Sequence, residues 1–131
     1  KLENDLIGIL KIEKIGLKAT VKEGSNSKIL KDYIGHIEGT SLYDGNICLA
    51  AHNRGNKYSY FARLNELKNG DIVELTDNSG KTIKYAVYNK YVVNPEDVAC
   101  TSQLTNGNKE VTLITCTNYG KQRLVVKARE V

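Results

Sequence analysis

Short apolar runs, separated by turn-forming residues, recur along almost the whole chain. They occupy residues 7–12, 17–21, 45–51, 71–75, 82–93, 111–115 and 124–128. Runs of about four to eight residues that are rich in Val, Ile and Thr and bounded by Gly, Asn or Asp are typical of β-strands. Seven or eight such strands with few helices predict a mostly β fold, either an antiparallel sandwich or a barrel.

The clearest local signal lies in residues 71–87. Apolar and polar side chains alternate within 72–75 and again within 82–87, as they do in half-buried strands. Between them, Asp77-Asn78-Ser79-Gly80 is a turn sequence. The sequence therefore predicts a hairpin over 71–87.

Two other stretches have the apolar spacing of a helix. Residues 25–33 carry Ile29, Leu30 and Tyr33, and residues 58–67 place Tyr60, Phe61, Leu64 and Leu67 on one face. Gly70 follows the second stretch as a stop signal. We expect one or two short helices.

The composition fits one soluble globular domain over residues 1–131. The chain is 40% hydrophobic and 26% charged, with a net charge of +4. A chain of this size can bury about two-thirds of its unfolded surface, which is enough for a core without cross-links. Lys and Glu are interspersed rather than clustered, so no nucleic-acid surface is indicated.

The start of the chain bears on its origin. No apolar run reaches the roughly 18 residues that a membrane span needs, and no signal peptide is recognisable. The chain begins at Lys1 and contains no Met. We therefore expect a fragment of a longer precursor, whose amino-terminal signal or anchor is absent from this sequence.

A cysteine and an arginine flank the turn between the last two apolar runs. Cys116 ends the run that begins at Val111, and Arg123 opens the next one after a short polar loop. If the two runs are antiparallel neighbours, the thiol and the guanidinium face each other across the mouth of a hairpin. A thiol with a pKa of about 8.5 is mostly protonated at neutral pH, so a nucleophilic cysteine needs a nearby His or Arg and a proton donor. Cys116 is our candidate nucleophile.

The chain offers two histidines as partners for this thiol. His52 follows the apolar run 45–51, a strand-end position like that of Cys116, whereas His36 lies in a Gly-flanked stretch expected to be a loop. A lone histidine is more often structural than catalytic, so spacing alone leaves open whether either histidine is structural or catalytic. Cys48 and Cys100 are read as buried structural cysteines. The three cysteines show no metal-binding spacing, and their odd number means that at least one does not pair within the chain.

Taken together, these motifs resemble the sortases, the cysteine transpeptidases of Gram-positive cell surfaces. The family's nucleophile signature is matched by Thr112-Leu113-Ile114-Thr115-Cys116. Its histidine strand end is matched by Leu49-Ala50-Ala51-His52, and its arginine by Arg123-Leu124-Val125-Val126. Further matches run in family order over nearly the whole chain, among them Gly35-His36 and Val93-x-Pro95-x-Asp97.

The resemblance implies a closed eight-stranded β-barrel of sortase type with one or two short helices. It also implies roles for individual residues. Cys116 would be the nucleophile, His52 the general acid and base, and Arg123 the group that stabilises substrate and oxyanion. Thr115 would contact substrate, and His36 would not be catalytic. The implied scheme needs no metal and no cofactor, although Glu38, Asp44, Glu96 and Asp97 fall in loops where some sortases bind calcium.

The implied substrate is a surface protein whose carboxy-terminal sorting signal resembles Leu-Pro-x-Thr-Gly. The enzyme would cleave between Thr and Gly through a thioacyl intermediate and join the protein to an amine of a cell-wall precursor. It would work on the extracellular face of the plasma membrane, held there by an amino-terminal segment outside this chain. Strand residues within 83–93 would form the groove floor.

Subclass and function leave alternatives. The lack of a lid segment before Ile7, the lack of Trp and the short stretch between Pro95 and Val111 favour a class D-like or housekeeping-like sortase. One alternative function is a cysteine peptidase that releases the same acyl-enzyme to water. The other is a non-catalytic β-barrel that binds a peptide by strand addition.

Overall fold

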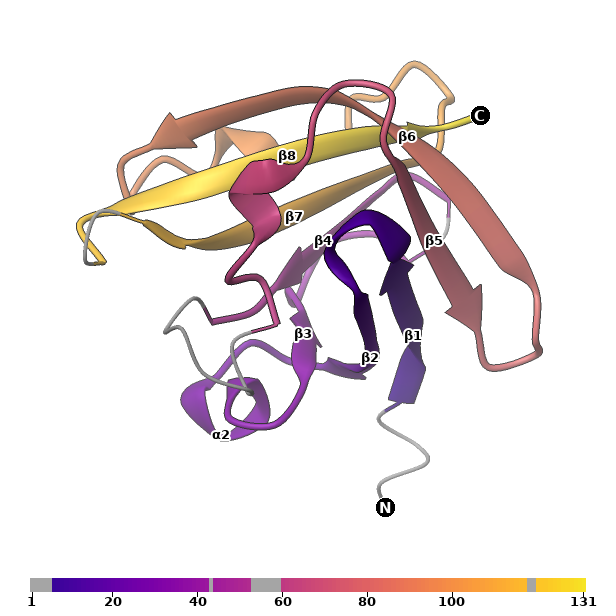
Figure 1. Ribbon diagram of the computed structural model, residues 1–131, viewed down its shortest axis with the longest axis horizontal. Helices are drawn as coiled ribbons and strands as arrows, with labels where there is room; N and C mark the ends of the chain where they lie inside the picture. The colour runs from indigo at the N-terminus through magenta and orange to yellow at the C-terminus, as the bar shows by residue number, and fades with distance from the viewer. Residues whose placement is uncertain (1–5, 43, 53–59, 118–119) are drawn as a thin grey trace.

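The computed structural model describes residues 6–42, 44–52, 60–117 and 120–131, which form a closed barrel of eight strands (Figure 1). Around the barrel the strands follow the order β1-β2-β3-β4-β7-β8-β6-β5. The β2/β3 and β4/β7 pairs are parallel, and the other pairs are antiparallel. The strands are β1 Leu6–Ile12, β2 Leu17–Glu23, β3 Ile34–His36, β4 Asn46–Ala50, β5 Ile72–Asp77, β6 Thr82–Val93, β7 Glu110–Thr117 and β8 Gln122–Glu130.

The predicted β fold and its barrel form are confirmed, and each predicted run contains a strand. The hairpin over 71–87 is also confirmed, since β5 pairs with β6 around a turn in which Gly80 has a φ of +90°. Glycine takes such a left-handed conformation without the penalty that a Cβ would bring. One strand was missed: β3 includes His36, which we expected in a loop.

The helical predictions are only partly right. Within 25–33 there is a single turn, α2 (Ser27–Leu30), which lies beside β3 at one end of the barrel (Figure 1). The described part of 58–67 is not an α-helix but turns followed by the 3₁₀ segment η2 (Leu64–Glu66). Phe61, Leu64 and Leu67 are all fully buried. Their spacing of three suits a 3₁₀ turn, in which side chains at i and i+3 are eclipsed. Two further 3₁₀ segments are η1 (Glu13–Ile15) and η3 (Ala99–Thr101).

The barrel interior takes alternate side chains from each strand. On β7 these are Val111, Leu113 and Thr115, and on β8 they include Leu124 and Val126, all of which are buried. Because strand side chains alternate, the intervening residues of β7 and β8 face outward. Cys116 and Arg123 therefore belong to the outer face of the barrel, not to its core.

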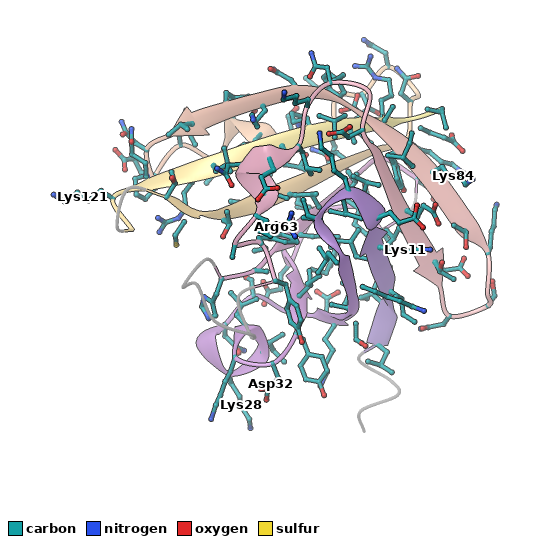
Figure 2. The ribbon with its side chains drawn as sticks, viewed as in Figure 1. Lys11, Lys28, Asp32, Arg63, Lys84 and Lys121 are labelled. Atoms are coloured by element: carbon teal, nitrogen blue, oxygen red, sulfur yellow. The ribbon has the colours of Figure 1, made fainter. Side chains whose placement is uncertain are left out.

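Charged side chains are spread over the surface, as their interspersed order predicts. Lys11 on β1, Lys28 on α2 and Lys84 on β6 lie on separate elements in Figure 2. In the part of the chain that the structure describes, no helix is long and apolar enough to cross a membrane.

Candidate active site

Cys116 and Arg123 are direct partners in the antiparallel ladder between β7 and β8. Directly opposite residues of such a pair have Cβ atoms about 5 Å apart on the same face of the sheet. Val93 of β6 is the next partner of Arg123, which places all three in one row across the outer face. The facing arrangement predicted for the thiol and the guanidinium thus holds at the level of strand register.

The guanidinium of Arg123 contacts the β7–β8 turn. Its Nη1 donates to the carbonyl oxygens of Gly120 and Gln122, each at 3.0 Å. The side chain is half-buried. Because a guanidinium carries five N–H donors, one nitrogen can hold the turn while others reach a ligand.

His52 lies just beyond the end of β4, the strand that flanks β7 on its other side. The parallel register joins Cys48 to Thr112 and Ala50 to Ile114. Beyond it, the Ala51 amide donates to the Ile114 carbonyl oxygen at 3.3 Å, so His52, the next residue, lies at the same end of the sheet as Cys116. His52 is half-buried, and its carbonyl oxygen accepts a hydrogen bond from the Phe61 amide at 3.2 Å. The fold therefore brings the strand ends of all three predicted catalytic residues to one edge of the barrel, while their roles stay predictions.

The side chain of Thr115 points into the barrel, whereas that of the adjacent Cys116 belongs to the outer face. It is 2% exposed, and its hydroxyl donates to the carbonyl oxygen of Ala51 at 2.7 Å. The substrate contact expected of Thr115 stays a prediction. What the geometry adds is a side-chain link between the strand that carries Cys116 and the strand that leads to His52.

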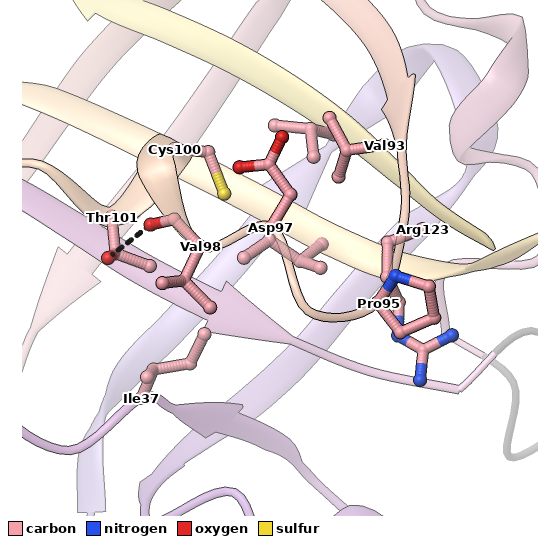
Figure 3. A pocket seen from close by; sticks show the side chains of 10 residues that line it. Ile37, Val93, Pro95, Asp97, Val98, Cys100, Thr101 and Arg123 are labelled. Atoms are coloured by element: carbon pink, nitrogen blue, oxygen red, sulfur yellow. Dashed lines mark hydrogen bonds between the residues drawn. The ribbon is translucent and has the colours of Figure 1, made fainter.

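A pocket of about 180 Å³ adjoins this row of residues (Figure 3). Its lining is mostly apolar and comes from the outer face of β6, β7 and β8, from residue 37 and from the connection between β6 and β7. The lining residues are Ile37, Val93, Pro95, Asp97, Val98, Cys100, Thr101, Ile114, Arg123 and Val125. Arg123 thus belongs both to the pocket wall and to the row that contains Cys116.

The groove floor predicted within 83–93 stays a prediction, and this pocket draws little on that stretch. Of the stretch 83–93, only Val93 lines it, because Ile83, Tyr85 and Val87 point into the barrel core. Ile114 and Val125 were missed. The strand alternation contains the signal that could have found them, since a residue two positions from an outward-facing Cys116 or Arg123 also faces outward.

The outer wall of the pocket is attached to the barrel by polar side chains. The amide nitrogen of Gln103 donates to the Asn46 carbonyl at 2.9 Å, and the Asn46 backbone amide donates back to Gln103 Oε1 at 2.9 Å. Lys127 Nζ donates to the carbonyl oxygen of Cys100 at 2.9 Å and to the hydroxyl of Thr112 at 3.0 Å. These bonds hold η3 against the outer face of β4, β7 and β8.

The remaining histidine has a structural environment. His36 is 3% exposed; its Nδ1 lies 2.8 Å from Glu23 Oε1 and its Nε2 lies 3.0 Å from the carbonyl oxygen of Ser41. The Thr40 hydroxyl is also 3.0 Å from Nε2. Both ring nitrogens therefore join β3 to the segments beside it.

Cys48 and Cys100 are buried thiols, as predicted, and do not form a disulfide with each other. Burial raises the pKa of Cys48 to about 11 and also raises the pKa of Cys100. Because the thiolate is the nucleophilic form, both are poor nucleophiles near neutral pH. Among the described residues, no three His, Cys, Asp or Glu side chains are grouped as a metal site would require.

Comparisons with known proteins show which family this barrel belongs to. A family model described as the Sortase domain matches residues 10–131. Sortase A of Bacillus anthracis is 31% identical over 115 residues, which cover 87% of this chain and 53% of that protein. The chain spans about half the length of the curated relatives it matches.

Two solved structures show how far the likeness extends. Sortase C-1 of Actinomyces oris has a TM-score of 0.90 and 32% identity, over 99% of this chain and 77% of that one. The Clostridium perfringens sortase D5 transpeptidase has a TM-score of 0.87 and 32% identity, over 97% of this chain and 79% of that one. With the barrel order and the family match in agreement, the chain belongs to the sortase family.

Proposed function

We propose that this protein is a sortase-type cysteine transpeptidase that acts on surface proteins bearing a Leu-Pro-x-Thr-Gly-like sorting signal. The observation that carries the proposal is the cross-strand pairing of Cys116 with Arg123 beside an apolar pocket. Membership of the sortase family supports the reaction class. His52, at the adjoining strand end, completes the set of groups that a thiol-based acyl transfer needs.

In the first half-reaction, the Cys116 thiolate attacks the carbonyl carbon of the Thr–Gly bond. A C–S bond forms, and the negative charge moves to the carbonyl oxygen, where the guanidinium of Arg123 donates to it. The C–N bond then breaks, and the imidazolium of His52 gives its proton to the departing glycine amine. The products are a thioester on Cys116 and the released carboxy-terminal segment.

In the second half-reaction, an amine of a cell-wall precursor attacks the thioester. Neutral His52 accepts the proton that the amine loses, and the Cys116 thiolate leaves as the new amide forms. The enzyme returns to its starting state with no net change in protons or electrons. No step is assigned to a metal or a cofactor.

The pocket suits the apolar part of the signal. Its walls are aliphatic and include Val93, Val98, Ile114 and Val125. Arg123 belongs both to this lining and to the row of residues that contains Cys116. With a Leu-Pro pair buried there, residue x of the signal would lead from the pocket to the Thr whose carbonyl carbon Cys116 attacks. Burial of such side chains contributes about 25 cal/mol per Å² of apolar area removed from water.

We further propose that the protein works on the extracellular face of the plasma membrane, held there by an amino-terminal segment outside this sequence. Its partners would be sorting-signal proteins and a cell-wall amine. The class D-like or housekeeping-like subtype stays a prediction, since sortases named A, C and D are all similar to this chain.

The decisive experiment is a peptide-library cleavage assay read by mass spectrometry, with and without added primary amines. The proposal expects cleavage after Thr and a new amide product whose mass includes the amine. A product released only to water, whatever the amine concentration, would identify a cysteine peptidase instead. Binding of the peptide without turnover would identify a non-catalytic barrel.

A further inference from the structure

We propose that Thr115 is a positioning residue, whose hydroxyl sets the direction of His52 relative to Cys116. The inference rests on the proposed function, because it assigns His52 a role in that reaction. It starts from the hydrogen bond of 2.7 Å from Thr115 Oγ1 to the carbonyl oxygen of Ala51.

The hydrogen bond lies where the β4–β7 ladder ends. The last pair in register is Ala50 with Ile114. Beyond it, the Ala51 amide donates to the Ile114 carbonyl at 3.3 Å, while the Ala51 carbonyl oxygen receives the Thr115 hydroxyl. Thr115 therefore extends the contact between the two strands past the regular ladder, to the residue that precedes His52.

The geometry of the peptide unit carries this contact to the imidazole. The Ala51 carbonyl and the His52 nitrogen belong to one planar peptide unit, so a hydrogen bond to that oxygen fixes the peptide plane on the N-terminal side of His52. The peptide plane on the C-terminal side of His52 is held by the hydrogen bond from the Phe61 amide to the His52 carbonyl oxygen at 3.2 Å. With both planes held, the Cα–Cβ direction of His52 is set.

Burial makes this bond costly to lose. Thr115 is 2% exposed and Ala51 is 5% exposed. A buried carbonyl that loses its donor pays a desolvation penalty, and the backbone relaxes toward another partner. Such relaxation would turn the imidazole away from the thiol. Thr115 also directly precedes Cys116 in the chain. Its hydrogen bond therefore connects β7, which carries the proposed nucleophile, to the end of β4, which leads to His52.

The test compares Thr115→Val, which removes the hydroxyl at nearly constant shape, with Thr115→Ser, which keeps it. Thr112→Val is the matched control, since it removes another buried hydroxyl from the same strand, one that donates to Asn46 Oδ1 instead. Each variant is first checked for cooperative unfolding by circular dichroism. If Thr115→Val does not fold, Thr115→Ala takes its place.

The main readout is the imidazole NMR spectrum without peptide. The chain has two histidines, so His36 serves as an internal reference. We expect Thr115→Val to shift and broaden the His52 signals and to leave those of His36 in place, whereas Thr115→Ser and Thr112→Val keep the wild-type His52 signals. With peptide, kcat of Thr115→Val should fall about ten- to a hundredfold, because a misplacement of about 1 Å can have that effect. Its KM should stay within about twofold, as expected when ground-state binding is unaffected.

Three results would overturn the proposal. Unchanged His52 signals in the valine variant would show that the hydroxyl does not position the imidazole. A raised KM with unchanged kcat would mark Thr115 as a substrate contact. Serine and valine variants that behave alike would assign the effect to the methyl group. If the wild-type protein showed no transpeptidation, the proposed function would be refuted. The positioning role would still be decided by the His52 signals, because the spectra need no substrate.

Discussion

The side-chain amide of Asn46 donates to the carbonyl oxygen of Cys100 at 2.9 Å, although the two residues lie 54 positions apart. The same nitrogen donates to the Ser102 carbonyl at 3.1 Å, and Asn46 Oδ1 accepts the Thr112 hydroxyl at 2.6 Å. Asn46 is fully buried on the outer face of β4. One amide thus joins the barrel to the segment that forms the outer wall of the pocket.

We predict that Asn46→Ala loosens this wall. The change leaves buried partners unsatisfied and should lower the free energy of unfolding by about 2–4 kcal/mol. Amides of residues 98–103 should exchange faster with deuterium, and KM for the peptide should rise. Asn108→Ala is the control, since it removes one bond, to the Thr105 carbonyl, in the same connection but outside the pocket lining. Equal exchange rates in the two variants would contradict the anchoring role of Asn46.

Cys116→Ala is expected to abolish cleavage of a sorting-signal peptide. In the proposed mechanism the sulfur of Cys116 forms the thioester, and the residue is half-buried near a strand end. The variant's free energy of unfolding should therefore change by no more than about 1 kcal/mol. Chromatography of the reaction with equal amounts of folded wild-type and variant protein measures cleavage, and urea unfolding of the two proteins measures the change in stability. Cleavage at the wild-type rate would rule out Cys116 as the nucleophile.

Arg123→Lys should reduce kcat/KM strongly. An ammonium group lacks the planar, several-donor geometry of a guanidinium, so it neither holds the turn carbonyls nor meets an oxyanion in the same way. Loss of one donor to the oxyanion lowers kcat by about a hundred- to a thousandfold. Arg63→Lys is the matched control, because Arg63 pairs with Glu66 on the surface. Steady-state kinetics should leave that control near wild type, and a similar loss in both variants would argue against a specific role of Arg123.

The three cysteines should react with iodoacetamide at very different rates. Burial and raised pKa values protect Cys48 and Cys100, so at pH 7.5 the native protein should be labelled first at Cys116. Peptide mapping after timed alkylation measures this order. Labelling of the two buried thiols should follow only when urea unfolds the barrel. If Cys100 were modified as fast as Cys116, the pocket would be open to its thiol.

Stability should fall at alkaline pH through Cys48. Its pKa is raised by burial from 9.0 to about 11, so the folded state holds this proton more tightly than the unfolded chain does. The stabilisation is complete below pH 9 and is lost as the pH rises through 11, which corresponds to roughly 2–3 kcal/mol for the full change. Urea unfolding between pH 7 and 10.5 should show the decline. In Cys48→Ala the decline of stability with pH should be shallower. A decline remains because Cys100 and Tyr88, whose pKa values are also raised, still contribute. An unchanged slope would assign the decline to other groups.

Much of the local structure could be read from the sequence because it has local causes. Alternation within 72–75 and 82–87 and the turn at Gly80 were enough for the β5–β6 hairpin. β3 could not be found in this way. It has three residues, includes Gly35, and becomes a strand because β2 and β4 offer partners on its two sides.

The candidate site divides along the same line. The residue types and their strand-end positions in the sequence point to Cys116, His52 and Arg123, and a short loop makes the last two strands antiparallel neighbours. Only the tertiary structure shows that Thr115 turns its hydroxyl to Ala51, that Arg123 contacts its own turn, and that η3 covers the outer face of β7 and β8. These contacts join residues far apart in the chain, or they depend on which face a side chain takes once the barrel closes. Periodicity along a sequence specifies strands, whereas the partners of each strand follow from burial that the whole chain must satisfy at once.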